Sequence, residues 1–471
     1  MPSQAAITAI ILTVVFMISS ILVLYLSTIT ASNIVSDYPF RLVYFFGHWW
    51  NSPIEWKCDD SALINDMKEI KRVGFNVIAV DHEISQCMSD GYLNNSCGQN
   101  SNFQHKWESD WKLCEREHWA ANISGLKLLP WLQLSAGADI SKLESTYGVT
   151  IKRATNQSGY IDNNVALVTD QSFQLALADY VNDYLSHFIN YGTLPIVNDN
   201  GQQKYLVGIM VETGWNEFVP YSFDDSTNQQ FRNWLQSNYA SIGNLNSAWG
   251  TSYSSFDSID PKNNSIFNYS SFPAQKSVQD HARFRAKLLS DVLQNVTSIV
   301  ESKYPQVTFA IEVPYPPSSP GYDAMRWKYN SANFYELFES SNIPYVIIRH
   351  DGCTQFGCGA IYNTSYTSFT IKQDLDELNS LGKKVVIAYR YSKDADKTWT
   401  YEAFNDAWGI GIYNWNELAD SQTPIFGSIT GTWTPRYGWL TPGNTFDTSS
   451  SSVPKVFVKN KLDQYLSFQP Q

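Results

Sequence analysis

The sequence predicts an α/β fold, a (β/α)8 (TIM) barrel, preceded by an amino-terminal transmembrane helix. Eight apolar, β-rich runs alternate with amphipathic stretches, a pattern typical of parallel strands joined by crossover helices. The chain has 471 residues, a length that suits one barrel with insertions. No glycine-rich phosphate turn accompanies the strands, so an open doubly wound sheet is the less favoured arrangement.

A long uncharged segment opens the chain. The first charged side chain is Asp37, and residues 5–30 contain only apolar, aromatic and small hydroxyl residues. As a helix this run would span about 39 Å, more than the roughly 30 Å hydrocarbon core of a bilayer. A signal peptide normally has a basic start and a shorter apolar region, so cleavage near Thr30 is the alternative. We therefore expect an anchor at residues 1–36 and one folded domain at residues 37–471.

The eight apolar runs give the expected strands in chain order: 41–50, 75–84, 126–135, 205–212, 307–315, 345–352, 384–391 and 409–417. Helical periodicity between them predicts helices at 62–72, 172–189, 279–302, 370–381 and 401–408. Residues 137–164 are expected to form a polar insertion near the rim of the barrel. Functional side chains of such barrels lie at the carboxyl ends of the strands, so those ends are the candidate site.

Acidic and aromatic residues gather at these predicted strand ends. Indole rings stack on the apolar faces of sugars and carboxylates bind sugar hydroxyls, so this lining indicates a carbohydrate ligand. Asp81 and Glu83 flank His82, but adjacent strand residues point to opposite faces, so no metal site is expected. The expected binding residues are Trp49, Trp50, Asp81, Trp131, Trp215, Asn216, His350, Tyr389, Arg390 and Trp415.

The composition argues against other classes of protein. Charged residues make up 17% of the chain, and the net charge is −12. Nucleic-acid binding is not expected, because it depends on Lys and Arg neutralising phosphates and the chain has no basic run. A charge-poor surface suits an acidic exterior, where carboxylates are largely protonated. We take an acidic exterior as a hypothesis.

Cysteines and glycosylation sequons agree with export. The six cysteines are an even number, which predicts disulfides in an oxidising compartment. The expected pairs are Cys353–Cys358, Cys87–Cys97 and Cys58–Cys114. Seven Asn-X-Ser/Thr sequons indicate a glycoprotein with its barrel outside the cell membrane, secretion being the alternative. They begin at Asn94, Asn122, Asn156, Asn263, Asn268, Asn295 and Asn363.

One stretch carries a specific family resemblance. Residues 231–259 contain a Phe-Arg-x-Trp-Leu helix and then Leu-Asn-x-Ala-Trp-Gly-Thr at 245–251. This stretch resembles the segment after strand four in glycoside hydrolase family 42 and related β-galactosidase-like enzymes. Weaker similarity covers residues 66–77, 281–285 and 345–351. The resemblance implies a barrel glycosidase that hydrolyses O-glycosidic bonds without a cofactor.

The resemblance also implies catalytic residues. The family has a general acid/base Glu at the end of strand four and a nucleophilic Glu at the end of strand seven. Glu212 matches the first position, with Glu217 after Asn216 as the alternative. Strand seven ends without a carboxylate, so the second carboxylate is expected from another strand end, the candidates being Glu312, Asp351 and Glu417. Glu312 has a plainer interpretation, an ion pair with Arg349 or Arg390.

Three functional outcomes remain at this stage. If another strand end supplies the second carboxylate, the protein is expected to be an extracellular glycoside hydrolase that cleaves an oligosaccharide or glycan by paired carboxylates. A tyrosine nucleophile at Tyr389 is the second outcome, since tyrosine serves this role in sialidases. Loss of catalysis is the third and predicts a carbohydrate-binding or cell-envelope protein on a degenerate barrel. The expected partners are a carbohydrate and, through residues 5–30, a membrane.

Overall fold

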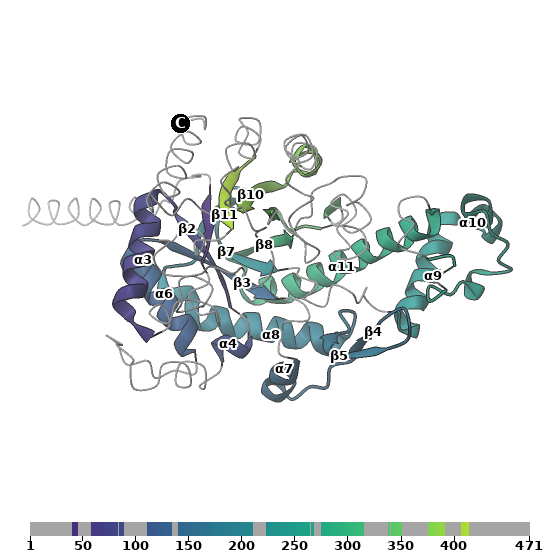
Figure 1. Cartoon of the computed structure of the whole chain (residues 1–471), viewed down its shortest axis with the longest axis horizontal. Helices are drawn as coiled ribbons and strands as arrows, with labels where there is room; N and C mark the ends of the chain where they lie inside the picture. The colour runs from purple at the N-terminus through teal and green to yellow at the C-terminus, as the bar shows by residue number, and fades with distance from the viewer. Residues whose placement is uncertain are drawn as a thin grey trace, which may run out of the picture.

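A closed barrel of parallel strands forms the centre of the molecule (Figure 1). The computed structural model describes residues 40–45, 58–82, 84–88, 111–133, 140–210, 223–263, 265–267, 275–314, 338–339, 341–350, 375–390 and 407–413. The barrel strands are β1 (Arg41–Tyr44), β2 (Val77–Asp81), β3 (Lys127–Gln133), β7 (Gln202–Met210), β8 (Val307–Pro314), β9 (Tyr345–His350), β10 (Lys384–Arg390) and β11 (Gly409–Tyr413). All eight predicted strands, and the predicted barrel, are confirmed.

Two pairings close the barrel. Strand β3 pairs with β7, and β11 pairs with β1 so that Arg41 lies opposite Ile410. Glycines permit this close approach in β11, because a Cβ on Gly411 would lie 2.9 Å from the carbonyl oxygen of Leu42. A ninth strand, β6 (Ile196–Asp199), adds to the sheet by antiparallel pairing with β7.

Helices cover the outside of the barrel. They include α3 (Asp60–Val73), α4 (Ile84–Cys87), α6 (Lys112–Ser124), α8 (Gln171–Phe188), the short η2 (Ile189–Tyr191) and α11 (Lys276–Lys303). Three predicted helices correspond to α3, α8 and α11. Of the helix predicted at 370–381, residues 375–380 are described and helical. Of the helix predicted at 401–408, residues 401–406 lie outside the described residues, and residues 407 and 408 are described and not helical.

Helix α3 illustrates how local sequence sets an element. Its N-cap Asp59 accepts hydrogen bonds from the backbone amides of Ser61 and Ala62 at 2.7 and 3.1 Å, which satisfies two of the unpaired donors of the first turn. Gly74 ends the helix with a φ of 122°, in the region of positive φ that glycine adopts without steric penalty. The apolar side of α3 packs on the barrel.

Strand alternation divides the apolar side chains into two layers. One layer fills the barrel interior and the other lies between the strands and the helices. The interior layer includes Tyr44, Leu129, Trp131 and Ala310. Gly208 makes room for the largest of these, because a Cβ there would clash with the Trp131 ring and lie 2.7 Å from the carbonyl oxygen of Pro130. The interior is therefore packed with side chains, as in other eight-stranded barrels.

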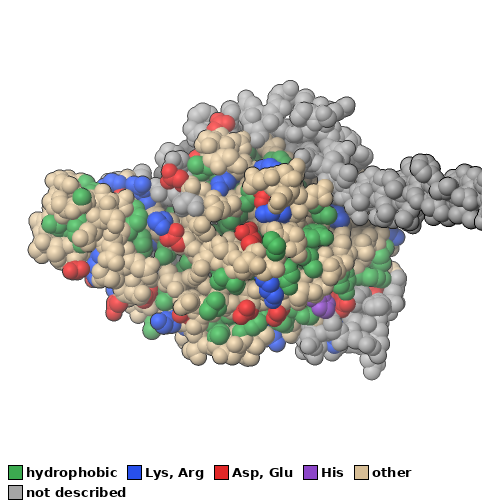
Figure 2. All heavy atoms as spheres, turned by 180° about the vertical axis from the view of Figure 1, so that it is seen from behind, with side chains coloured by type: hydrophobic (Ala, Val, Ile, Leu, Met, Phe, Trp, Pro, Cys, Tyr) green, Lys and Arg blue, Asp and Glu red, His purple; other side chains and the backbone are tan. Residues whose placement is uncertain are grey.

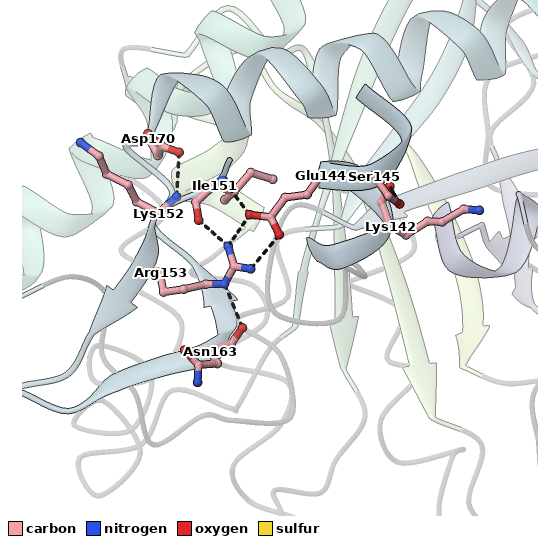
Figure 3. A network of polar contacts seen from close by, with 8 residues as sticks. All are labelled: Lys142, Glu144, Ser145, Ile151, Lys152, Arg153, Asn163 and Asp170. Carbon is pink, nitrogen blue, oxygen red and sulfur yellow. Dashed lines mark hydrogen bonds and ion pairs between the residues drawn. The ribbon is translucent and has the colours of Figure 1, made fainter. Parts of the chain in front are cut away.

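The insertion predicted at residues 137–164 contains regular structure. It forms α7 (Ile140–Tyr147) and a hairpin of β4 (Arg153–Thr155) and β5 (Ile161–Ala166). Arg153 joins the two parts, donating to both carboxylate oxygens of Glu144 at 3.1 and 3.0 Å (Figure 3). Its Nε also donates to the carbonyl oxygen of Asn163 at 3.0 Å. This ion pair lowers the pKa of Glu144.

A separate lobe follows β7. We call it the α9–α10 lobe; it comprises α9 (Asp225–Tyr239), α10 (Ile242–Trp249) and η3 (Phe256–Ser258), packed on the amino-terminal part of α11 (Figure 1). Buried Asp280 of α11 accepts hydrogen bonds from the hydroxyl of Tyr239 at 2.5 Å and the indole Nε1 of Trp249 at 2.8 Å. The residues that carry the family resemblance thus build the core of this lobe.

The disulfide prediction requires a correction. Cys87 is bonded to Cys114, with their Cα atoms 5.3 Å apart, so the predicted pairs Cys87–Cys97 and Cys58–Cys114 are wrong. The prediction took Cys87–Cys97 from proximity in sequence and Cys58–Cys114 as the remaining pair. Packing instead brings α4 against α6 and with it Cys87 against Cys114. Cys58 is also disulfide-bonded. Cys97, Cys353 and Cys358 lie outside the described residues.

On the face drawn in Figure 2, acidic and basic side chains are interspersed among uncharged ones. Among the described residues, no helix combines the length and apolar character needed to cross a bilayer. The anchor predicted at residues 5–30 lies outside them.

Candidate active site

Two buried carboxylates lie at the carboxyl ends of barrel strands. Glu312 of β8 is 0% exposed, and its backbone is in register with Met210 of β7 and Ile347 of β9. Ala310, two residues earlier, belongs to the interior layer, so alternation directs Glu312 into the barrel as well. Asp81 ends β2 in the same way after the interior residue Ala79 and is 1% exposed. Both were predicted site residues, and both face the barrel interior.

An aromatic pair lies in the same interior. The ring of Trp131 stacks on that of Tyr44 with centroids 6.0 Å apart and an interplanar angle of 10°. Trp131 is in register with Asp81 and is fully buried. Within the described part of the chain, its indole Nε1 has no hydrogen-bond partner. Trp131 is a predicted site residue and Tyr44 is not, although the alternation of residues 41–45 indicates an inward-facing tyrosine.

The remaining candidates are placed only in part. His350 and Tyr389 are register partners at the carboxyl ends of β9 and β10, and Arg390 is the last residue of β10. Strand β10 is the seventh barrel strand along the chain, and it contains no Asp or Glu, in agreement with the predicted departure from the family pattern. The other predicted residues lie outside the described residues: Glu212, Glu217, Asp351, Glu417, Trp49, Trp50, Trp215, Asn216 and Trp415.

A buried hydrogen-bond network lies behind β2, between α6 and α8. Thr193 Oγ1 lies 2.5 Å from Nδ1 of His118, whose Nε2 is 2.6 Å from the Tyr184 hydroxyl. The same hydroxyl lies 2.7 Å from Nδ1 of His82, and Nε2 of His82 lies 2.8 Å from Oε2 of Glu117. The network follows directly after Asp81 and holds the end of β2 against the helices.

The network has a consistent direction when both imidazoles are neutral. His118 Nε2–H then donates to the Tyr184 oxygen, and the Tyr184 hydroxyl donates to His82 Nδ1. His82 Nε2–H in turn donates to the carboxylate of Glu117, the natural acceptor at the end of the chain. Burial holds the pKa of His118 well below its usual range, with His82 adding to the effect. Burial raises the pKa of Tyr184.

One group of side chains has ligand atoms spaced for a metal. A ring nitrogen of His82 and the sulfurs of Cys87 and Cys114 all lie within 4.8 Å of one another. The two sulfurs are joined in a disulfide, whereas metal ligation requires thiolates. This group therefore serves as packing beside the network.

The free energy of unfolding is expected to decrease as the pH falls below about 6.5, where an unperturbed histidine gains its proton. Burial lowers the pKa of His118 and also of His281, beside which Arg285 adds to the shift. The unfolded chain therefore binds protons at a pH where the folded chain does not. Each histidine should cost about 1.4 kcal/mol of unfolding free energy per pH unit until its folded pKa is reached. Urea denaturation from pH 7.5 to pH 5 measures this slope.

The His281→Leu variant is the control for this slope. The ring of His281 lies among those of Phe223, Phe231 and Phe267, at 5.2, 4.8 and 5.6 Å between centroids, so an apolar side chain suits the site. The variant should lose about half of the two-histidine slope. Equal slopes in the variant and the unsubstituted protein, or stability that increases toward pH 5, would contradict the assignment.

Comparisons with known proteins agree with the architecture. Residues 196–339 match the glycoside hydrolase family 42 β-galactosidase model, which confirms the resemblance inferred from residues 231–259. Similar folds occur in the catalytic domain of a β-amylase from Paenibacillus polymyxa (TM-score 0.59, 13% identity, 82% of this chain and 94% of that chain). A similar fold occurs also in a β-galactosidase from Halorubrum lacusprofundi (TM-score 0.55, 16% identity, 91% of this chain and 58% of that chain). Another occurs in a β-galactosidase from Rahnella sp. R3 (TM-score 0.57, 12% identity, 92% of this chain and 57% of that chain).

The similarity to these proteins covers part of their length and is low in sequence identity. The chain spans little more than half the length of the two β-galactosidases, and at these identities the likeness is one of fold. No curated protein matches the chain significantly. The matched segment contains β7, β8 and the α9–α10 lobe.

Proposed function

We propose that this protein is an extracellular glycoside hydrolase that cleaves O-glycosidic bonds in an oligosaccharide or glycan. The observation that carries the proposal is the position of Glu312. It is a fully buried carboxylate on the interior face of the fifth barrel strand, at the end where barrel enzymes place their reacting groups. The family-42 match over the strands on either side of the α9–α10 lobe supports the same chemistry.

Glu212 is the proposed general acid/base. It lies two residues beyond Met210, the last residue of β7, and Met210 is in register with Glu312 on the neighbouring strand. Leu206 and Gly208 face the barrel interior, and the same alternation continued to position 212 favours an inward glutamate. Glu212 would protonate the leaving oxygen while Glu312 attacks the anomeric carbon or activates a water. Asp351 and Glu417 are the alternatives to Glu312 for this second role.

Sugar binding is proposed for the aromatic and polar residues around the same strand ends. A buried indole N–H without a partner costs about 1–3 kcal/mol, and a sugar hydroxyl is a suitable acceptor for Nε1 of Trp131. Asp81 is a suitable acceptor for a second hydroxyl. Trp49, Trp50, Trp215, Asn216, His350, Arg390 and Trp415 complete the proposed set.

Non-catalytic carbohydrate binding is the second candidate function. The absence of Asp and Glu from β10, the seventh barrel strand, favours it, because retaining enzymes of the resembled family need a carboxylate there. A barrel that lost this residue and kept Trp131 and Asp81 would still bind sugars. Tyr389 of β10 is the nucleophile in the third arrangement, and it predicts a covalent tyrosyl-glycoside.

We also propose that the barrel is exported and stays attached to the membrane. Residues 5–30 supply the expected anchor. The Cys87–Cys114 disulfide supports an oxidising compartment. Secretion after cleavage near Thr30 is the alternative, and amino-terminal sequencing of the purified protein separates the two.

Replacing Glu212 by Gln tests the catalytic proposal. The amide keeps the size of the side chain and cannot supply a proton, so kcat on chromogenic glycosides should fall by about 10²–10⁴-fold. A panel of aryl glycosides differing in sugar and anomeric configuration identifies the substrate with the unsubstituted protein. The matched control is Glu69→Gln on the outer helix α3, where Glu69 pairs with the exposed Arg72 at 2.6 Å. This control should leave kcat unchanged.

Two results decide between the candidate functions. Equal turnover by the Glu212→Gln variant and the unsubstituted protein would overturn the role of Glu212. Saturable glycan binding in calorimetry, with no turnover of any glycoside in the panel, would support the carbohydrate-binding alternative and overturn the hydrolase.

A further inference from the structure

Four of the Asn-X-Ser/Thr sequons lie within the described residues, and they fall into two structural groups. Those at Asn156 and Asn263 lie in turns, whereas those at Asn122 and Asn295 lie within helices α6 and α11. The sequence motif is the same in all four. Only the local geometry distinguishes them.

In the first turn sequon, Asn and Ser are presented together. Asn156 lies at the end of the hairpin formed by β4 and β5, and the Ser158 hydroxyl donates to its Oδ1 at 2.7 Å. The backbone amide of Tyr160 donates to the same oxygen at 2.9 Å, which fixes the carboxamide. Ser158 is exposed and Asn156 is half-buried. Within the described residues, Nδ2 of Asn156 makes no hydrogen bond.

The second turn sequon repeats this geometry. The hydroxyl of Ser265 donates to Oδ1 of Asn263 at 2.7 Å, and the backbone amide of Ser265 donates to it at 3.0 Å. Both side chains are exposed. Nδ2 of Asn263 likewise makes no hydrogen bond to the described part of the chain. In both turns the serine hydroxyl is exposed and lies next to the asparagine carboxamide.

In the two helical sequons the asparagine carboxamide and the Ser or Thr hydroxyl lie apart. Residues two apart on a helix point about 200° from each other, so the Asn and the hydroxyl lie on opposite faces. Asn122 is exposed, but the Ser124 hydroxyl is directed to the carbonyl oxygen of Ile64 and is buried. Asn295 donates through Nδ2 to Gln174 at 2.5 Å, and Thr297 is 4% exposed.

We propose that Asn156 and Asn263 are N-glycosylation sites of the folded protein and that Asn122 and Asn295 are not. The donor is an oligosaccharide linked to a lipid phosphate. In the reaction Nδ2 of the asparagine forms a bond to the anomeric carbon, the bond from that carbon to the lipid phosphate oxygen breaks, and Nδ2 loses one proton. The inference requires the export proposed above and is independent of the glycosidase activity.

The two sites flank one contact. Gln157, next to Asn156, donates through Nε2 to the carbonyl oxygens of Pro261 and Phe267 at 3.1 and 3.2 Å. This contact joins the β4–β5 hairpin to the α9–α10 lobe, which lie side by side in Figure 1. The lobe presents mostly uncharged atoms on the face drawn in Figure 2. Glycans on Asn156 and Asn263 would cover this seam and add hydration where the protein has few charges.

Glycosylation in vitro compares the folded protein with its own peptides. The folded full chain and its digest with an endoproteinase that cleaves after glutamate are each incubated with a purified single-subunit oligosaccharyltransferase and a lipid-linked oligosaccharide, and occupancy is measured by peptide mass spectrometry. Cleavage after glutamate keeps all four asparagines inside their peptides, whereas trypsin would cut between Lys262 and Asn263. We expect all four sequons to be modified in the digest. In the folded chain we expect modification of Asn156 and Asn263 and none above background at Asn122 or Asn295.

Serine variants assign the modification to each site. Ser158→Ala and Ser265→Ala should each abolish modification of their own asparagine only, while Ser145→Ala, which removes a hydroxyl outside any sequon, should change nothing. The proposal is overturned if folded Asn122 or Asn295 is modified as fast as Asn156 and Asn263. It is equally overturned if Asn156 and Asn263 react in the digest and not in the folded chain.

Discussion

Replacing Glu312 by Gln is expected to lower kcat by about 10²–10⁴-fold and to leave the unfolding free energy nearly unchanged. The amide fills the same volume in the barrel interior, where Glu312 is 0% exposed, so packing is retained. It lacks the charge that would attack the anomeric carbon or accept a proton from water. Turnover of the best aryl glycoside and urea denaturation are measured on the same preparation.

Azide separates the possible roles of Glu312. If Glu312 is the nucleophile, azide should restore turnover of a Glu312→Ala variant, because it attacks the anomeric carbon and yields a glycosyl azide. The matched variants are Asp351→Ala and Glu417→Ala, the other candidates for the second carboxylate. Rescue of either of these, with Glu312→Ala unaffected, assigns the nucleophile elsewhere. Unchanged kcat in Glu312→Gln with lower stability would give Glu312 a structural role only.

Replacing Asp60 by Ala is expected to lower the unfolding free energy by about 3–5 kcal/mol. Asp60 of α3 accepts a hydrogen bond from Nε of Arg116 in α6 at 2.5 Å, and the two side chains are 0% and 1% exposed. Loss of the carboxylate removes the ion-pair partner of a guanidinium that lies away from water, and the loss of this pairing dominates the cost. Urea denaturation at neutral pH measures the effect.

The same helix provides the control. The pair of Glu69 and Arg72 has a similar distance, 2.6 Å, but Arg72 is 66% exposed, so Glu69→Ala should cost at most about 1 kcal/mol. A double variant, Asp60→Leu with Arg116→Met, should regain most of the lost stability, because both members of the buried pair are replaced by apolar side chains. A loss below about 1 kcal/mol for Asp60→Ala would contradict this account of the buried pair.

The barrel could be predicted because each of its strands is a local run of apolar residues that can be recognised without knowing its neighbours in space. A run such as Val77–Asp81 is buried along its whole length, as expected for a strand between helices and a packed interior. Helix α6 was missed for a definite reason. Its buried face carries Arg116, Glu117 and His118, and these polar residues remove the apolar periodicity on which the prediction depends.

The sequence predicted which strand ends form the candidate site. Asp81 and Glu312 follow from that rule, because alternation along one strand determines which side chains face inward. The Cys87–Cys114 bond was beyond it, since it depends on the packing of segments distant in sequence. The family motif at 231–259 has a related limit. Trp249 and Tyr239 bind Asp280 in the core of the lobe, so the motif indicates architecture more directly than catalysis.

The pairing of β1 with β11 has a consequence for biosynthesis. Arg41 leaves the ribosome long before its partner Ile410 is made. At about 5–20 residues per second, the first strand waits roughly 20–70 s for the last one. During that time β1 has one unpaired edge, which is open to non-native strand pairing. Closure of the barrel is therefore a late event, and it makes the yield of folded protein sensitive to whatever protects the nascent amino-terminal half.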